Sequence, residues 1–117
     1  MSISNSIKTA DFKNEKHVPA IKLLSKEGDV YTVEVHVGSE IAHPNTLEHS
    51  ISYIDLYIKS AEGPIQLIGK AQFNAHGELD LVTEPNAIFK FKAPKGGTLH
   101  AVSYCNIHGL WESELSL

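Results

Sequence analysis

Val30-Tyr31-Thr32-Val33-Glu34-Val35-His36-Val37 is a stretch in which apolar and polar side chains alternate. In an extended chain, alternate residues point to opposite faces, so Val33, Val35 and Val37 share one face and the polar residues take the other. Valine is β-branched and favours the pleated geometry of a sheet. The pattern therefore predicts a β-strand with one buried face and one solvent-facing face.

Similar short segments lie on both sides of this strand, with glycine and proline turns between them. We expect strands over residues 20–25, 30–37, 50–60, 65–75, 78–82, 87–92, 98–104 and 110–117. Seven or eight short strands with almost no helical periodicity are typical of an antiparallel β-sandwich or barrel. The sequence therefore predicts an all-β fold of about seven strands.

The 117 residues are expected to form one domain, 1–117, in which residues 1–14 are a loose N-terminal arm. A chain of this length buries roughly two-thirds of its unfolded surface on folding, which suffices for one core. The only cysteine cannot form an internal disulfide, which favours a reducing compartment. No stretch approaches the roughly 20 apolar residues that span a bilayer, and no signal peptide is evident. We expect a cytoplasmic protein that does not contact membranes.

The charge balance argues against nucleic acid as a partner. The formal net charge is −4, the pI is about 5.9, and the chain has scattered lysines and no arginine. A phosphate backbone is normally bound by a basic patch, which this sequence lacks. The seven histidines, in contrast, exceed what packing requires and direct attention to metal binding.

One candidate for half of a metal site is Cys105-Asn106-Ile107-His108-Gly109. A thiolate and an imidazole three residues apart can reach one metal ion from a tight turn, and Gly109 can adopt the backbone angles that end this turn. An isolated pair of this kind is also compatible with ordinary core packing, because free cysteine is often buried.

A second candidate is the pair His43 and His49. In an extended chain these residues would lie about 20 Å apart, too far to share an ion. Asn45 and Glu48 resemble a helix-capping pair, so we expect a short helical turn that brings the two histidines to about 9 Å.

A third motif is Glu15-Lys16-His17-Val18-Pro19, in which Pro19 pushes Val18 toward extended geometry and favours a loop or a strand entry. Loops at one end of a β-sandwich cluster in space. Segments 15–19, 43–49 and 105–108 can therefore meet, although they are remote in sequence.

These three motifs, with the last extended through Gly109-Leu110-Trp111, occur in an order and at separations that resemble the superoxide reductase family. The resemblance is to the one-iron neelaredoxin type, the desulfoferrodoxin iron-binding domain family, and it covers nearly the whole chain from residue 15. It implies an immunoglobulin-like β-fold and one mononuclear iron per chain, Fe2+ or Fe3+. The metal ligands that it implies are His17, His43, His49 and His108 as equatorial imidazoles and Cys105 as the axial thiolate.

The resemblance also implies an activity and partners. The reaction is the one-electron reduction of superoxide to hydrogen peroxide, and an external donor of the rubredoxin type re-reduces the iron. By similarity, Glu15 occupies or shields the sixth iron position, and Lys16 places a positive charge beside it. A homo-oligomer, tetramer or dimer, is expected.

Two other kinds of site remain open from the residues alone. A blue-copper electron carrier also has a cysteine and a histidine near its C-terminus, but it normally adds an axial methionine, and Met1 is the only methionine here. A zinc-stapled binding module normally uses four ligands, whereas five candidates are present.

Four further residues have structural interpretations. Trp111 either shields the metal or belongs to the sandwich core. We expect His36, His76 and His100 to be solvated or structurally hydrogen-bonded and not to bind the metal.

Overall fold

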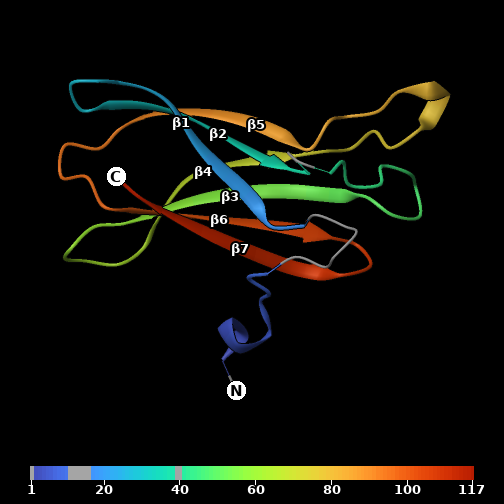
Figure 1. Ribbon diagram of the computed structural model, residues 1–117, viewed down its shortest axis with the longest axis horizontal. Helices are drawn as coiled ribbons and strands as arrows, with labels where there is room; N and C mark the ends of the chain where they lie inside the picture. Colours follow the sequence, from blue (N-terminus) through green and yellow to red (C-terminus); the bar gives the residue numbers. More distant parts are fainter. Residues whose placement is uncertain (1, 11–16, 39–40) are drawn as a thin grey trace.

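Seven strands form two antiparallel sheets in the described part of the chain, residues 2–10, 17–38 and 41–117 of a computed structural model (Figure 1). The strands are β1 (Pro19–Glu27), β2 (Val30–Val37), β3 (Ile51–Lys59), β4 (Gln66–Gln72), β5 (Asn86–Lys92), β6 (Thr98–Cys105) and β7 (Gly109–Ser116). One sheet has the order β1-β2-β5 and the other the order β4-β3-β6-β7. The predicted all-β, immunoglobulin-like sandwich is confirmed.

The core lies between the two sheets and follows the alternation of β2. Val33, Val35 and Val37 are 0%, 0% and 1% exposed, as the sequence predicts. They pack against residues of the other sheet, among them Ile54 of β3 and Leu99 of β6. Each fully buried aliphatic side chain contributes roughly 1.5–3 kcal/mol to folding, so this contact holds the two sheets together.

The inward-facing row of β6 leads directly to the candidate metal residues. Leu99, Ala101, Ser103 and Cys105 are alternate residues, and all four are fully buried. Cys105 therefore ends this row at one end of the sandwich. The turn to β7 and the loop that precedes β3 lie at the same end of the molecule (Figure 1).

The predicted strand over residues 78–82 is wrong. The structure has a single turn of 3-10 helix, η2 (Glu78–Asp80), and Leu79 and Asp80 have positive φ angles of 52° and 64°. The apolar side chains of this segment have no sheet to pack against, since Leu79 is 101% and Leu81 64% exposed. Only Val82 pairs, through an isolated bridge to His76. The segment is therefore the tip of the connection between β4 and β5.

Of the arm expected over residues 1–14, the structure describes residues 2–10. Residues Ile3–Ser6 form a short 3-10 helix, η1, which projects from the sandwich (Figure 1). Lys8 then joins β7 in a parallel bridge, with hydrogen bonds from Lys8 N–H to the Leu110 carbonyl and from Glu112 N–H to the Lys8 carbonyl. This pairing fixes the arm before residues 11–14, which lie outside the described residues.

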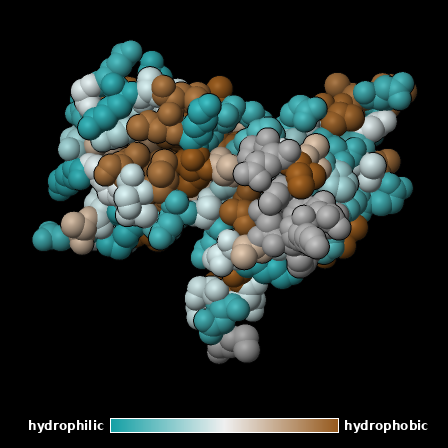
Figure 2. Space-filling model, in the orientation of Figure 1, coloured by the Kyte–Doolittle hydropathy of each residue, from teal (hydrophilic) through white to brown (hydrophobic). Residues whose placement is uncertain are grey.

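On the face that Figure 2 shows, hydrophobic side chains gather in the left part of the view, with hydrophilic side chains around them. Leu23 and Leu24, for example, are 43% and 44% exposed. Single exposed apolar residues are normal for folded proteins and do not by themselves mark a site. No helix within residues 2–10, 17–38 and 41–117 is long and apolar enough to cross a membrane.

Candidate metal centre

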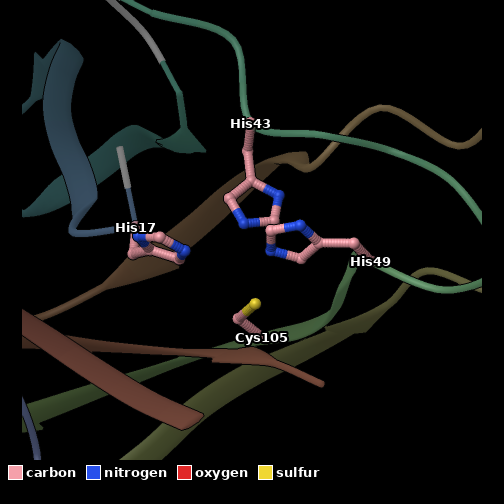
Figure 3. A group of neighbouring side chains, drawn as sticks. All are labelled: His17, His43, His49 and Cys105. Atoms are coloured by element: carbon pink, nitrogen blue, oxygen red, sulfur yellow. The ribbon is translucent and has the colours of Figure 1, made fainter. Parts of the chain in front are cut away.

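Four side chains from three distant segments meet at one end of the sandwich: His17, His43, His49 and Cys105. Their potential ligand atoms all lie within 4.8 Å of one another. Figure 3 shows the three imidazoles and the thiol gathered around a common space. His17 and Cys105 are fully buried and His43 is 6% exposed. The three motifs that the sequence singles out therefore converge.

His108 completes a ring of four imidazoles. Successive ring centroids are 4.6 Å apart for His17 and His43, 4.7 Å for His43 and His49, 5.0 Å for His49 and His108, and 4.8 Å for His108 and His17. Neighbouring rings are steeply inclined, at 66° to 81°. His17 and His49 face each other across the ring, with centroids 6.3 Å apart and planes 27° apart. The four rings thus lie around one another, and three of them, those of His17, His43 and His49, have ligand atoms in the group with Cys105 that lies within 4.8 Å.

The spacing of the donor atoms fits a single transition-metal ion. The 4.8 Å span is about twice a metal–ligand bond of roughly 2.0–2.3 Å. Nε2 of His17 and Nδ1 of His108 are 3.1 Å apart. Two nitrogens bound at right angles, each about 2.1 Å from a metal, would lie about 3.0 Å apart. Imidazole nitrogen and thiolate sulfur suit iron, zinc or copper and do not suit magnesium or calcium.

The hydrogen bond of His43 fixes which of its nitrogens can bind a metal. Nδ1 of His43 donates to the Pro44 carbonyl oxygen at 2.7 Å. The proton on Nδ1 leaves the lone pair on Nε2, which is the form of a histidine ligand. The backbone of the same loop therefore prepares His43 for ligation.

The turn after β6 holds the sulfur of Cys105 in place. The His108 backbone N–H donates to Cys105 Sγ at 3.4 Å, and His108 Nδ1 lies 3.8 Å from the same sulfur. These two contacts hold the sulfur in a fixed position at the end of β6. Gly109 has a φ of 82°, as the sequence predicts for the residue that ends this turn.

The short helical turn expected between His43 and His49 is wrong. Residues 46–49 form a bend, in which Thr46 N–H donates to the His49 carbonyl and His49 N–H donates to Thr46 Oγ1. The side chain of Asn45 does not cap a helix, because its Nδ2 donates to the Thr83 carbonyl in another segment. A reversal of the chain, and not a helix, brings the two imidazoles together.

Two residues that support the site were missed by the sequence analysis. Asn106 accepts a hydrogen bond from Ser50 N–H and donates one to the Glu48 carbonyl, so it joins the β6–β7 turn to the His49 side of the loop. Ser103 Oγ donates to the His17 carbonyl at 2.9 Å. In the sequence, Ser103 alternates with Leu99, Ala101 and Cys105, and this spacing was the signal that could have identified it as an inward-facing residue.

Trp111 covers one ligand ring. It is fully buried, and its ring stacks on His17 with centroids 4.5 Å apart and planes 13° apart. Lys8 Nζ lies 5.1 Å from the centroid of the same indole. A large aromatic side chain in this position excludes water from that side of His17. Trp111 thus belongs to the sandwich interior and also shields the site.

His76 and His100 do not belong to this cluster of possible ligands. Glu15 and Lys16 are outside the described residues, so their roles stay predictions. His76 is hydrogen-bonded, with ring nitrogens 2.8 Å from Asn45 Oδ1 and 2.9 Å from the Phe73 carbonyl oxygen. His100 lies 3.8 Å from a carboxylate oxygen of Glu114.

Comparison with known proteins agrees with this geometry. Residues 9–114 match the family model described as Desulfoferrodoxin. The chain is 53% identical over 117 residues to a superoxide reductase of Pyrococcus abyssi, and the match covers 98% of each chain. It is 41% identical over 123 residues to neelaredoxin of Megalodesulfovibrio gigas, covering 97% of this chain and 95% of that protein.

A crystal structure of a superoxide reductase in the oxidized state superimposes with a TM-score of 0.95 at 48% identity. That comparison covers 99% of both chains. The fold is therefore shared over nearly the whole length, and about half of the residues are identical. This chain belongs to the desulfoferrodoxin family.

Proposed function

We propose that this protein is a superoxide reductase, which converts superoxide to hydrogen peroxide by adding one electron and two protons. The observation that carries this proposal is the gathering of His17, His43, His49 and Cys105 at one centre, in a chain similar to superoxide reductases over nearly its whole length. The family binds one iron, and the donor atoms present here fit that metal. Iron held by these residues would supply the single electron that superoxide requires.

We propose that five residues hold the iron: the four imidazoles and the Cys105 thiolate. His108 belongs to this set because its Nδ1 lies 3.1 Å from His17 Nε2 and its ring lies next to the rings of both His17 and His49. The imidazoles are neutral ligands, and the thiolate contributes the one negative charge of the set. The His108 N–H to Sγ contact and the burial of Cys105 keep that charge away from water.

Glu15 and Lys16 take the roles that the family resemblance implies: Glu15 would be a carboxylate that shields the iron, and Lys16 a cation beside the site. Both precede His17 directly in sequence. On a protein of net charge −4, one cation beside the site offsets the repulsion of an anionic substrate. Lys16 therefore acts on the encounter with superoxide more than on electron transfer.

The electron donor, the assembly and the compartment belong to the same proposal. A rubredoxin-type protein returns the electron after each turnover, the protein forms a homo-oligomer, tetramer or dimer, and it works in the cytoplasm. The single cysteine supports a reducing compartment, because that thiol must stay unoxidised to bind iron.

The blue-copper alternative is not favoured. Such sites use two histidines and one cysteine with a weak axial ligand, whereas four imidazoles surround the centre here. A closed zinc site with four ligands also leaves one of the five donors unused.

Metal analysis combined with product stoichiometry tests the proposed function. We expect one iron per chain and one hydrogen peroxide formed per superoxide consumed, without oxygen release, when an external reductant is supplied. Dismutation would give one peroxide and one oxygen per two superoxide ions. Copper or zinc in place of iron, or release of oxygen, would contradict the proposal.

A further inference from the structure

His76 lies outside the metal centre but is held in a defined position. It belongs to the connection between β4 and β5, residues 73–85, which projects beyond the loop that leads into β3 (Figure 1). One ring nitrogen, Nδ1, is 2.8 Å from Asn45 Oδ1, and the other, Nε2, is 2.9 Å from the Phe73 carbonyl oxygen. The imidazole therefore links this connection to the loop that carries His43 and His49.

The orientation of the Asn45 amide is determined by its second contact. Asn45 Nδ2 donates to the Thr83 carbonyl oxygen at 2.9 Å, and a carbonyl oxygen can only accept. The amide oxygen is therefore the atom that faces His76. Both ring nitrogens of His76 face oxygens that only accept, Asn45 Oδ1 at Nδ1 and the Phe73 carbonyl oxygen at Nε2, and Nδ1 donates to Asn45 when it carries a proton. The 73–85 connection has two limbs, residues 73–76 and 82–85. Asn45 contacts His76 in the first limb and Thr83 in the second.

The two limbs are themselves held together. Thr83 N–H donates to the Ala75 carbonyl at 2.7 Å, and Ala75 N–H donates to Thr83 Oγ1 at 3.3 Å. His76 also bridges to Val82 across the same pair of limbs. The 73–85 connection is therefore a firm support to which Asn45 can be anchored.

The two halves of the loop have different supports. The His49 half is tied to the β6–β7 turn through Asn106. Asn45 stands two residues after His43, and its side chain ties the other half of the loop to the 73–85 connection. Residues 46–48 between the halves are exposed. Each half therefore has its own side-chain anchor.

We propose that His76 is a positioning residue of the metal centre, which holds the His43 half of the loop in place by donating from Nδ1 to Asn45. This inference rests on the proposed function, because it assumes that His43 binds the metal. Residues that orient metal ligands typically change metal affinity or activity by about 10–100-fold when they are mutated. Loss of the Nδ1 donor should weaken metal retention although every ligand is still present.

Two near-isosteric variants test the contributions of the two ring nitrogens of His76 separately. In His76→Asn, the side-chain amide nitrogen can take the place of Nδ1 and donate to Asn45. In His76→Gln, the amide nitrogen reaches the place of Nε2, so the contact with Asn45 is lost and the contact with the Phe73 carbonyl is kept. His100→Gln is the matched control, because His100 lies on β6 beside Glu114, five residues before Cys105.

The measurement is the rate at which the reduced, iron-loaded protein loses iron(II) to a chelator. We expect His76→Gln to lose iron about 10–100-fold faster than the parent protein, and His76→Asn and His100→Gln to stay close to the parent. Parent-like iron loss in His76→Gln would overturn the proposal. So would equal defects in His76→Asn and His76→Gln, because the Nδ1 donor would then not be the important group.

Hydrogen exchange followed by mass spectrometry adds a readout that does not depend on activity. A peptide covering residues 43–50 should exchange faster in His76→Gln and at the parent rate in His76→Asn, because only the former releases Asn45. Unchanged exchange in His76→Gln would overturn the inference even if the protein proves to bind another metal. Failure of the proposed function itself would appear separately, in the iron content and the product stoichiometry of the parent protein.

Discussion

Gly38 is the backbone position at which a single added carbon should disturb the metal centre. Its φ is 85°, a conformation that costs a residue with a side chain about 1–2 kcal/mol. A Cβ at this position would lie 2.6 Å from the His43 backbone nitrogen and 3.1 Å from the Ile41 carbonyl oxygen, although such contacts are essentially never below 3.0 Å. In Gly38→Ala, the backbone at residue 38 or at His43 must therefore give way by about 0.4 Å or more, and we expect His43 to move.

Gly97→Ala is a control with the same local defect at the other end of the sandwich. Gly97 has a φ of 137°, and its Cβ would lie 2.6 Å from the Lys59 carbonyl oxygen. Lys59 ends β3 and Ile51, next to the centre, begins it, so the two ends are about 26 Å apart at 3.3 Å per residue.

Both variants should lower the thermal unfolding midpoint by about 4–8 °C, given about 4 °C per kcal/mol for a domain of this size. Only Gly38→Ala should also lose iron about 10–100-fold faster to a chelator, because only it displaces a ligand. Thermal unfolding and iron release are measured on the same preparations. Equal iron loss in both variants would refute the reasoning, because the effect would then follow from lower stability alone.

Three further predictions concern other parts of the site. Cys105→Ser should abolish the visible thiolate-to-iron absorption of the ferric protein, since serine has no thiolate; an unchanged spectrum would remove Cys105 from the ligand set. Ser103→Ala should lower the free energy of unfolding by about 1 kcal/mol in denaturant titrations, because it removes the buried hydrogen bond to the His17 carbonyl. Lys16→Ala should lower the second-order rate with superoxide and flatten its dependence on ionic strength; the parent rate at low salt would contradict the role of Lys16.

The fold could be predicted where the residues carry a strong period of two. Val33, Val35 and Val37 are all buried, and the strands around them differ from expectation mainly at their ends. The same rule failed at Leu79 and Leu81, which alternate but are largely exposed. Periodicity shows which side chains could share a face, but it does not show whether another sheet lies opposite that face.

The candidate ligands could be predicted from the sequence more readily than the residues that hold them in place. The clustering of His17 with the other motifs follows from the loops at one end of a sandwich and from the family resemblance. The helical turn expected at Asn45 did not form, because that side chain binds Thr83 and His76, which are about 30 to 40 residues away in sequence. Such contacts between distant segments, like the bridge from Lys8 to Trp111, leave no local pattern in the sequence.

X-ray absorption at the iron edge of the purified, reduced protein tests the ligand set most directly. The five-ligand centre predicts one sulfur at about 2.3 Å and four nitrogens at about 2.1 Å, with one nitrogen fewer in His108→Ala. A spectrum without a sulfur neighbour, or a nitrogen shell that does not change in His108→Ala, would contradict the convergence of these side chains on one iron.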